Sequence, residues 1–157
     1  MISFDTKDGR FNLRSAAVII QNEHVLIHRA ASDDFWALPG GRVELFETSA
    51  EAIARELSEE LGLKCMVTRL LWCTENFFEY RSKKFHELAN YFLVSLMNAP
   101  KIESEKDFEG IEKSVDLVFR WVPIEKIGDY NLYPKFLTEG INNLPNSIQY
   151  LEINENA

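Results

Sequence analysis

Three glutamates crowd one flank of a predicted helix. The segment from Gly41 to Leu63, GRVELFETSAEAIARELSEELGL, contains Glu56, Glu59 and Glu60 at relative positions i, i+3 and i+4. At that spacing the carboxylates of a helix are neighbours. Like charges so placed each oppose helix formation by about 0.2–0.5 kcal/mol in water. A bound divalent cation would reverse the sign of this interaction and would also attract phosphate groups.

The type of cation follows from the ligand atoms. Carboxylate oxygens without an accompanying cluster of His or Cys favour Mg²⁺, with Mn²⁺ as the alternative, over Zn²⁺. The competing interpretation is a solvated acidic helix face, which is what most runs of like charge form. The spacing of the three glutamates alone leaves these two interpretations equally open.

The helix that must position the glutamates has clear ends. Thr48 and Glu51 form a capping-box pattern, and Gly62 stands where helices commonly stop, so we expect a helix over residues 48 to 61. Apolar residues at three- and four-residue steps predict a stripe that packs on a sheet. These residues are Ala50, Ile53, Ala54, Leu57 and Leu61.

Strand patterns surround this helix. The segments SAAVII and HVLIHRA predict a hairpin over residues 14 to 30, and residues 65 to 80 and 84 to 97 predict two longer strands that pair antiparallel. A further strand is expected near DLVFRWV, and a last helix should start at the proline of YPKFLTEGINNL. The tail after Pro145 stays open. Strands mixed with two helices predict one α/β or α+β domain over residues 1 to 157.

Composition narrows the class of protein. The chain has 157 residues, 46% of them hydrophobic and 27% charged, as in ordinary globular domains. A net charge of −8 disfavours unspecific binding to nucleic acid or to an anionic membrane. Neither an export signal nor an apolar run long enough to span a membrane is visible, so we expect a cytoplasmic protein. Cys65 and Cys73 are expected to remain free thiols.

The residues around the helix carry a resemblance. Reading from Gly41, five residues precede Glu47 and seven more precede Arg55, after which Glu56, Leu57, Glu59, Glu60, Gly62 and Leu63 follow. This segment, residues 41–63, resembles the Nudix box of the Nudix hydrolase family at every fixed position. The resemblance implies an α/β/α sandwich with a mixed β-sheet. It also implies a Mg²⁺-dependent pyrophosphohydrolase that cleaves a diphosphate linkage in a nucleotide, a nucleotide-sugar or a dinucleoside polyphosphate.

The resemblance assigns roles position by position. Glu56 and Glu60 fall where the family binds its metal, and Glu59 falls where the family binds metal or activates water. The carbonyl of Gly40 or Gly41 is implied to complete the site. Arg55 and Glu47 match a helix arginine paired with a loop carboxylate, a pair that either orients the site or takes part in the chemistry. Glu59 is the first candidate for the general base, although some members draw that base from a loop after the box.

One position departs from the pattern of several members. In them a metal-binding glutamate precedes the tryptophan of the late strand, whereas Arg120 precedes Trp121 here. A further ligand would have to come from elsewhere, and a solvated surface position is the alternative interpretation for every candidate. The candidates are Glu109, Glu112, Asp116 and Glu87.

Substrate binding is less well defined by the sequence. Arg14, Arg29 and His28 are candidates to reach phosphates from the first hairpin, with surface placement as the alternative for the arginines. Tyr80 lies near a position where a tyrosine resembles dinucleoside polyphosphate hydrolases, and aromatic faces suit nucleobases.

Two other functions stay open. One is a Nudix-fold module that binds or senses nucleotides without turnover. The other is an RNA 5′-end pyrophosphohydrolase, which the acidic balance disfavours. We expect a small nucleotide-type substrate, no membrane contact and no general nucleic-acid binding. A homodimer is expected only by analogy with the family.

Overall fold

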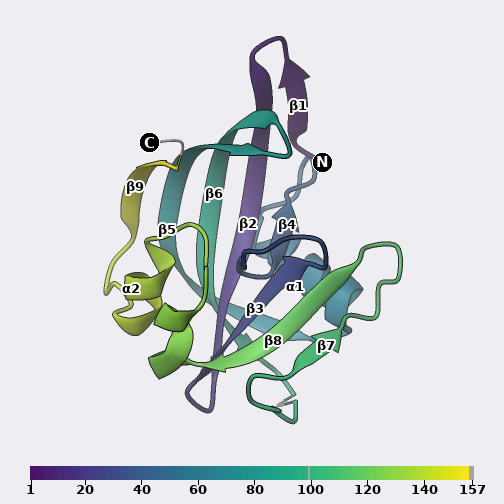
Figure 1. The fold of residues 1–157 in the computed structure, drawn as a ribbon, viewed down its shortest axis with the longest axis vertical. Coiled ribbons are helices and arrows are strands. Elements are labelled where there is room, and N and C mark those ends of the chain that lie inside the picture. The colour runs from purple at the N-terminus through teal and green to yellow at the C-terminus, as the bar shows by residue number, and fades with distance from the viewer. Residues whose placement is uncertain (99, 156–157) are drawn as a thin grey trace.

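The computed structural model of the chain describes residues 1–98 and 100–155. Within these residues the strands form a nine-stranded mixed sheet in the order β7-β8-β3-β2-β6-β5-β9, and β1 and β4 pair with β2 outside that order (Figure 1). The strands are β1 Ser3–Thr6, β2 Gly9–Gln21, β3 His24–Ala30, β4 Gly40–Arg42, β5 Cys65–Tyr80, β6 Lys83–Leu96, β7 Asp107–Glu109, β8 Leu117–Pro123 and β9 Gln149–Asn154. The helices are α1 Ser49–Leu61, the 3-10 helix η1 Ile124–Asp129 and α2 Leu137–Asn142. A large mixed sheet with few helices confirms the predicted fold class.

The first hairpin divides the sheet. β2 and β3 pair antiparallel only beside their turn, at Ile20 with Val25 and at Gln21 with His24. Away from the turn, β2 forms a long parallel pairing with β6, while β3 pairs with β8. The short strand β4 pairs with β2 on the side that β3 has left. This divergence makes room for β4 next to α1.

The second hairpin matches its prediction closely. β5 and β6 pair antiparallel from Cys65 with Leu96 to Tyr80 with Lys83. The turn residues Arg81 and Ser82 have φ of 50° and 63°, the left-handed conformation of a tight hairpin turn. β9 then adds in parallel to the free edge of β5. That strand lies in the tail whose structure the sequence pattern left open.

Helix α1 begins and ends at the predicted caps. The Thr48 hydroxyl accepts from the Glu51 amide, the Glu51 carboxylate accepts from the Thr48 amide, and Gly62 ends the helix at φ 66°. Ile53 and Leu57 are buried against Phe119 and Trp121 of β8 and against β2. The predicted stripe is wrong at Ala54, which is exposed, whereas Ala52 and Glu60 are buried. The helix is therefore rotated so that its carboxylate flank turns toward the sheet.

The opposite face of the sheet is covered by the C-terminal elements. Ile127 of η1, Leu132, and Leu137 and Ile141 of α2 pack with Trp72 and Tyr91 in a second core cluster. α2 starts three residues later than predicted, because Pro134 to Leu137 form a turn in which the Leu137 amide donates to the Pro134 carbonyl. The layers are thus α1, the sheet, and η1 with α2.

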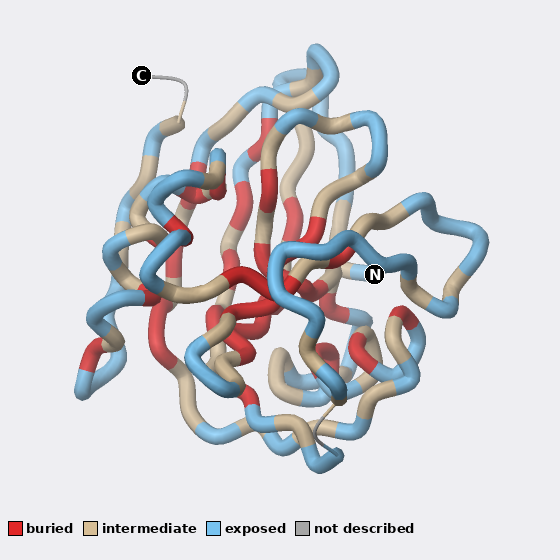
Figure 2. The backbone as a smooth tube through the Cα atoms, turned by 60° about the horizontal axis from the view of Figure 1, so that its bottom comes forward, coloured by how far each residue is buried: buried red, intermediate tan, exposed pale blue. Residues whose placement is uncertain are grey.

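Buried residues gather in the middle of the molecule, while loops at its ends are exposed (Figure 2). The sequence did not predict β1, β7 and η1, which are short and lie at the sheet edge or after a strand.

Both cysteines are free thiols, as expected. Among the described residues no helix is both long and apolar enough to cross a membrane.

Candidate active site

Two carboxylates of α1 meet the strand β4. The Glu56 side chain is 16% exposed and Glu60 is 7% exposed as a residue. A Cβ placed on Gly41 would lie 2.3 Å from the carboxyl carbon and an oxygen of Glu56. A glycine at this position is therefore what lets the strand backbone approach the acidic flank of the helix.

The two carboxylates are held in an unfavourable electrostatic environment. Two causes raise the pKa of Glu60 to about 8: its burial, which has the larger effect, and the nearby negative charge of Glu56. Burial also raises the pKa of Glu56, although the Arg55 guanidinium acts in the opposite direction. Among the described residues the Glu60 Oε2 atom is buried without a hydrogen-bond partner. A pair of buried acids with too few donors is a site that a cation would stabilise.

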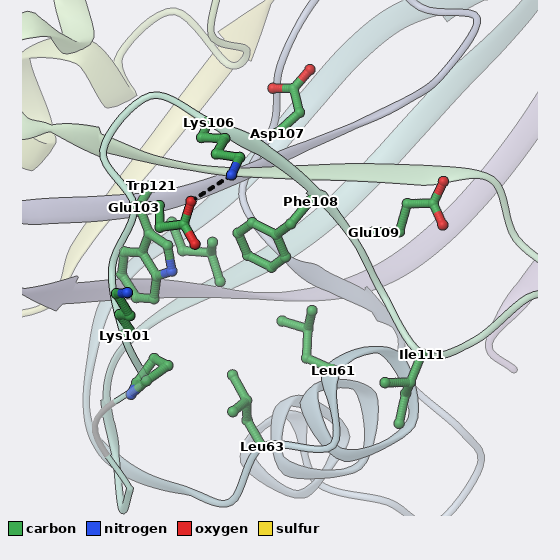
Figure 3. A pocket seen from close by; sticks show the side chains of 12 residues that line it. Leu61, Leu63, Lys101, Glu103, Lys106, Asp107, Phe108, Glu109, Ile111 and Trp121 are labelled. Carbon is green, nitrogen blue, oxygen red and sulfur yellow. Dashed lines mark ion pairs between the residues drawn. The ribbon is translucent and has the colours of Figure 1, made fainter.

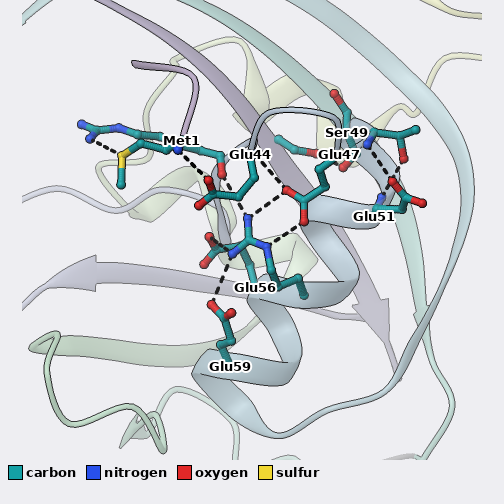
Figure 4. A network of polar contacts seen from close by, with 11 residues as sticks. Met1, Glu44, Glu47, Ser49, Glu51, Glu56 and Glu59 are labelled. Atoms are coloured by element: carbon teal, nitrogen blue, oxygen red, sulfur yellow. Dashed lines mark hydrogen bonds and ion pairs between the residues drawn. The ribbon is translucent and has the colours of Figure 1, made fainter. Parts of the chain in front are cut away.

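Arg55 ties the preceding loop to the helix through Glu47 and Glu56, which belong to one network of polar contacts (Figure 4). Its Nε and Nη2 atoms donate to the two carboxylate oxygens of Glu47 at 2.7 and 3.0 Å. Its Nη1 atom donates to Glu56 Oε1 at 3.0 Å and to Glu59 Oε2 at 3.3 Å, and Nη2 also reaches the Arg42 carbonyl at 3.2 Å. The guanidinium lowers the pKa of Glu47. One side chain thus fixes the loop, β4 and the carboxylates relative to one another.

The residues present fit a divalent cation in two respects. Glu60 offers an oxygen that lacks a partner, and the carbonyl of Gly41 belongs to a backbone that approaches Glu56 closely. In the described part of the chain, however, no three His, Cys, Asp or Glu side chains are gathered tightly enough to form a complete ion site. Glu59, whose side chain is 51% exposed, points to Arg55 instead (Figure 4). The structure therefore presents two carboxylates that are suited to a cation, with a third carboxylate nearby.

The predicted substrate residues lie in two places. The Arg14 guanidinium donates to the Leu38 carbonyl at 2.8 Å, and its charge lowers the pKa of Glu60. Arg29 Nη1 donates to the carbonyls of Ala31 and Asp33, and its guanidinium lies 5.1 Å from the Trp36 ring centre. Of these two arginines, Arg14 is therefore the one whose charge acts on the buried acid Glu60.

Tyr80 lies at the end of β5, where it contacts the loop that follows β3. The Tyr80 hydroxyl donates to Asp33 Oδ2 at 2.7 Å, and the ring packs edge-on against Phe35 at 5.9 Å.

His28, a further candidate from the first hairpin, is buried, and burial lowers its pKa to about 3. His28 is therefore neutral near neutral pH.

Arg120 has a contact network of its own. Its guanidinium pairs with Asp107 and lies 5.0 Å from the Trp36 ring centre. Phe119 and Trp121, its neighbours on β8, are the residues that pack toward α1. Position 120 therefore faces away from the buried acids.

Glu112 is the candidate further ligand whose charge acts on Glu60. That charge raises the pKa of Glu60. The Ile111 amide donates to the Glu60 carbonyl at 2.7 Å, which holds this loop against the end of α1. Glu109 instead approaches Lys113, and Glu87 is buried on the face of the sheet away from α1. Sequence spacing carries no signal for the effect of the Glu112 charge on Glu60, because that effect depends on how a distant loop docks.

A cavity of about 410 Å³ lies at the far end of α1. It is lined mostly by apolar side chains, among them Leu61, Leu63, Phe108 and Trp121 (Figure 3). Neither Arg55 nor the carboxylates of Glu56 and Glu60 line it. The cavity is therefore separate from the candidate active site.

Comparisons with known proteins agree on one family. A NUDIX domain family model matches residues 11–140. The RNA pyrophosphohydrolase of Pseudomonas paraeruginosa is 38% identical over 126 residues, which cover 69% of this chain and 74% of that protein. The protein of the same name from Halorhodospira halophila is 39% identical over 69 residues, 43% of this chain and 38% of that protein.

Solved structures show the same fold. A NUDIX hydrolase from Nitrosomonas europaea superimposes with a TM-score of 0.65 at 17% identity, covering 96% of this chain and 82% of that one. A UDP-X diphosphatase gives a TM-score of 0.58 at 25% identity, covering 89% of this chain and 66% of that one. The 17% identity of the first supports the architecture alone.

Proposed function

Because the chain belongs to the NUDIX domain family and is a hydrolase of diphosphate bonds, we propose that it is a Mg²⁺-dependent pyrophosphohydrolase of nucleoside diphosphate derivatives. The substrate class is a nucleotide, a nucleotide-sugar or a dinucleoside polyphosphate. The observation that carries the proposal is the buried Glu60 Oε2, which has no partner among the described residues and belongs to the same helix as Glu56, the carboxylate that Gly41 approaches.

Glu56 and Glu60 would hold the cation together with the Gly41 carbonyl. When bound, Mg²⁺, or Mn²⁺ in its place, neutralises phosphate oxygens and lowers the pKa of a water molecule. The raised pKa of Glu60 means that this side chain must lose its proton for the cation to bind. The two carboxylates therefore also set the pH at which the site forms.

Glu59 is proposed as the residue that accepts a proton from the attacking water. Its side chain is half exposed, and it is held by one contact of 3.3 Å from Arg55. Such a carboxylate is free to turn toward a substrate. Glu112 is the alternative base, because its loop is docked on the end of α1 and its charge reaches Glu60.

Arg55 and Glu47 are proposed as positioning residues. The fork of Arg55 donates to both oxygens of Glu47 and to Glu56, so it fixes the direction of a proposed cation ligand. Arg14 is proposed to contact substrate phosphates, since it is the predicted cationic residue whose charge acts on Glu60. Arg29 and Tyr80 would act through the loop near Phe35.

A second candidate substrate is the 5′ end of RNA. It is favoured by the similarity to proteins named RNA pyrophosphohydrolase, of which the Pseudomonas paraeruginosa protein aligns over most of both chains. The bond cleaved would again be a diphosphate linkage. The net charge of −8 counts against long contacts with an RNA backbone.

Residues 1–157 are proposed to act as a single domain. The described strands form one sheet, and both core clusters draw on strands from the first and last thirds of the chain.

The test is a substrate panel with products resolved by mass. Wild type and Glu60→Gln are incubated with Mg²⁺ and nucleoside triphosphates, ADP-sugars, dinucleoside polyphosphates, and capped or triphosphorylated RNA. We expect selective cleavage by wild type that chelation abolishes and that Glu60→Gln lacks. Cleavage of triphosphorylated RNA alone would select the second candidate. Equal cleavage by Glu60→Gln would contradict the proposed site, and nucleotide binding without any cleavage would point to a sensing module.

A further inference from the structure

A row of polar side chains crosses the sheet on the face opposite α1. Asn12 of β2 stands in register with Glu87 of β6, and Glu87 in turn with Asn76 of β5. Register partners in a sheet project their side chains to the same face. All three residues are buried, with 5%, 9% and 2% of their surfaces exposed. This polar row, Asn12, Glu87 and Asn76, lies where strand residues are ordinarily apolar.

Both amides of the polar row are oriented by contacts at its ends. The Ser3 hydroxyl donates to Asn12 Oδ1 at 2.6 Å, which turns Asn12 Nδ2 toward Glu87 Oε2 at 3.5 Å. At the other end Asn76 Nδ2 donates to Glu155 Oε1 at 2.7 Å. The Asn76 Oδ1 atom consequently points away from Glu155, and in the described part of the chain it is buried without a partner.

The polar row is therefore short of hydrogen-bond donors. Within residues 1–98 and 100–155 the Glu87 carboxylate receives one long contact, from Asn12, and its register neighbour Asn76 presents another acceptor. Burial raises the pKa of Glu87, which agrees with a carboxylate that lacks donors. A buried acceptor left unpaired is destabilising, so a ligand that brings hydrogen-bond donors to the row would relieve this penalty.

Arg14 and a set of aromatic rings flank the polar row on the same face of the sheet. Arg14 lies one step further along β2 on the same face, and its charge lowers the pKa of both Glu60 and Glu87. On the other side of the row, Phe85 lies two residues before Glu87 and on the same face of β6. The centre of its ring is 6.5 Å from that of Tyr80, which in turn packs on Phe35. A substrate whose phosphates lie at Arg14 would thus extend its nucleoside between the polar row and these rings.

We propose that Glu87, flanked by Asn76, binds a pair of adjacent hydrogen-bond donors on the nucleoside part of the substrate. This inference rests on the proposed function and names the group that the site selects. Two parts of a nucleotide present such a pair to a carboxylate: the N1–H and 2-amino edge of guanine, and the 2′,3′-diol of ribose. Adenine and cytosine offer one donor group beside an acceptor, so they would leave one acceptor of the row unpaired.

The experiment measures binding, not turnover. Calorimetry in the presence of Mg²⁺ compares three ligands: guanosine 5′-(α,β-methylene)diphosphate, the corresponding inosine compound, and the 2′,3′-dideoxy form of the guanosine compound. In all three the bridging carbon prevents hydrolysis. Inosine lacks the 2-amino group, and the dideoxy compound lacks the diol. The proteins are wild type, Glu87→Gln and the control Glu79→Gln, an exposed residue on the other face of β5.

The outcomes separate the two sources of donors. If guanine supplies them, wild type binds the guanosine compound about ten- to a hundredfold tighter than the inosine one, and Glu87→Gln removes the difference. If the diol supplies them, the loss of about the same size appears with the dideoxy compound. Wild-type affinities that agree within twofold for all three compounds would overturn the proposal and leave a bound water as the partner of the row. Because no cleavage is measured, this result is independent of whether the protein hydrolyses its ligand.

Discussion

Glu60 and Glu87 are both buried carboxylates, and they are positioned in different ways. Glu60 belongs to one helix, where Glu56 and Glu59 stand at helical spacing and Arg55 organises the flank. Glu87 belongs to a row assembled from three strands, and its neighbours Asn12 and Asn76 are 75 and 11 residues away in the chain. The acidic flank of α1 is therefore a local feature of the sequence, whereas the polar row exists only through strand register.

Cleavage and the choice of nucleoside would therefore depend on different parts of the molecule. The acidic flank depends on residues of α1 and on Gly41 of β4, so we expect substitutions elsewhere in the sheet to leave it largely unchanged. A row spread over β2, β6 and β5 alters with any one of its members and leaves the helix untouched. We accordingly assign bond cleavage to the acidic flank and choice of the nucleoside to the polar row. The following predictions test that division.

The largest effect is expected from Glu56→Gln. Removing one of two charged ligands should lower turnover about 10³-fold, because several kcal/mol of charge stabilisation are lost. Glu87→Gln should instead change the affinity for the nucleoside and keep turnover of saturating substrate within about tenfold. Steady-state kinetics on both variants measure the contrast. Equal losses of kcat in the two variants would remove the division between the regions.

Glu60→Gln should stabilise the metal-free protein at alkaline pH. The pKa of Glu60 rises from 4.5 to about 8 on folding, so its contribution to stability is present below pH 4.5 and is lost as pH rises through about 8. At pH 9 with a chelator, the free energy of unfolding of the variant should exceed that of wild type by about 1–4 kcal/mol. Urea titrations at pH 5 and 9 measure it. A variant less stable than wild type at both pH values would refute the assigned pKa.

Arg55→Ala should lower turnover about ten- to a hundredfold, as expected for a residue that orients ligands. Arg55→Lys should recover little of this loss, because a lysine cannot donate to both oxygens of Glu47 and to Glu56 together. Metal titrations of the two variants separate positioning from direct chemistry. Wild-type metal affinity in Arg55→Ala, with turnover still lost, would argue for direct participation.

The smallest effect is expected from Tyr80→Phe. The change removes the 2.7 Å bond from the Tyr80 hydroxyl to Asp33 and keeps the ring beside Phe35. We expect a loss of about 0.5–1.5 kcal/mol in unfolding free energy and a KM within about threefold of wild type. Thermal melts and kinetics provide the two numbers. A KM raised tenfold would show that the hydroxyl itself contacts substrate.

Local patterns predicted much of this molecule. The caps of α1 and the ends of β5 are where the sequence places them, since capping residues and hairpin turns act over a few residues. The rotation of α1 that exposes Ala54 and buries Glu60 was not predicted, because it depends on what Phe119 and Trp121 offer from β8.

Non-local contacts account for the remainder. β9 could not be placed from its sequence, since its pairing depends on the free edge of β5. Nothing in the spacing indicates that Glu112 would lie near Glu60 or that Glu87 would face Asn76. Those placements are decided by how a loop docks and how the strands align.

Whether the acidic flank of α1 holds the catalytic cation can be measured by a Mn²⁺ titration followed by electron paramagnetic resonance. Wild type, Glu60→Gln and Glu79→Gln are compared at pH 8.5, where the Glu60 carboxylate is largely ionised. We expect equal binding by wild type and Glu79→Gln, and an affinity at least about tenfold weaker in Glu60→Gln. Unchanged Mn²⁺ affinity in Glu60→Gln would contradict this expectation.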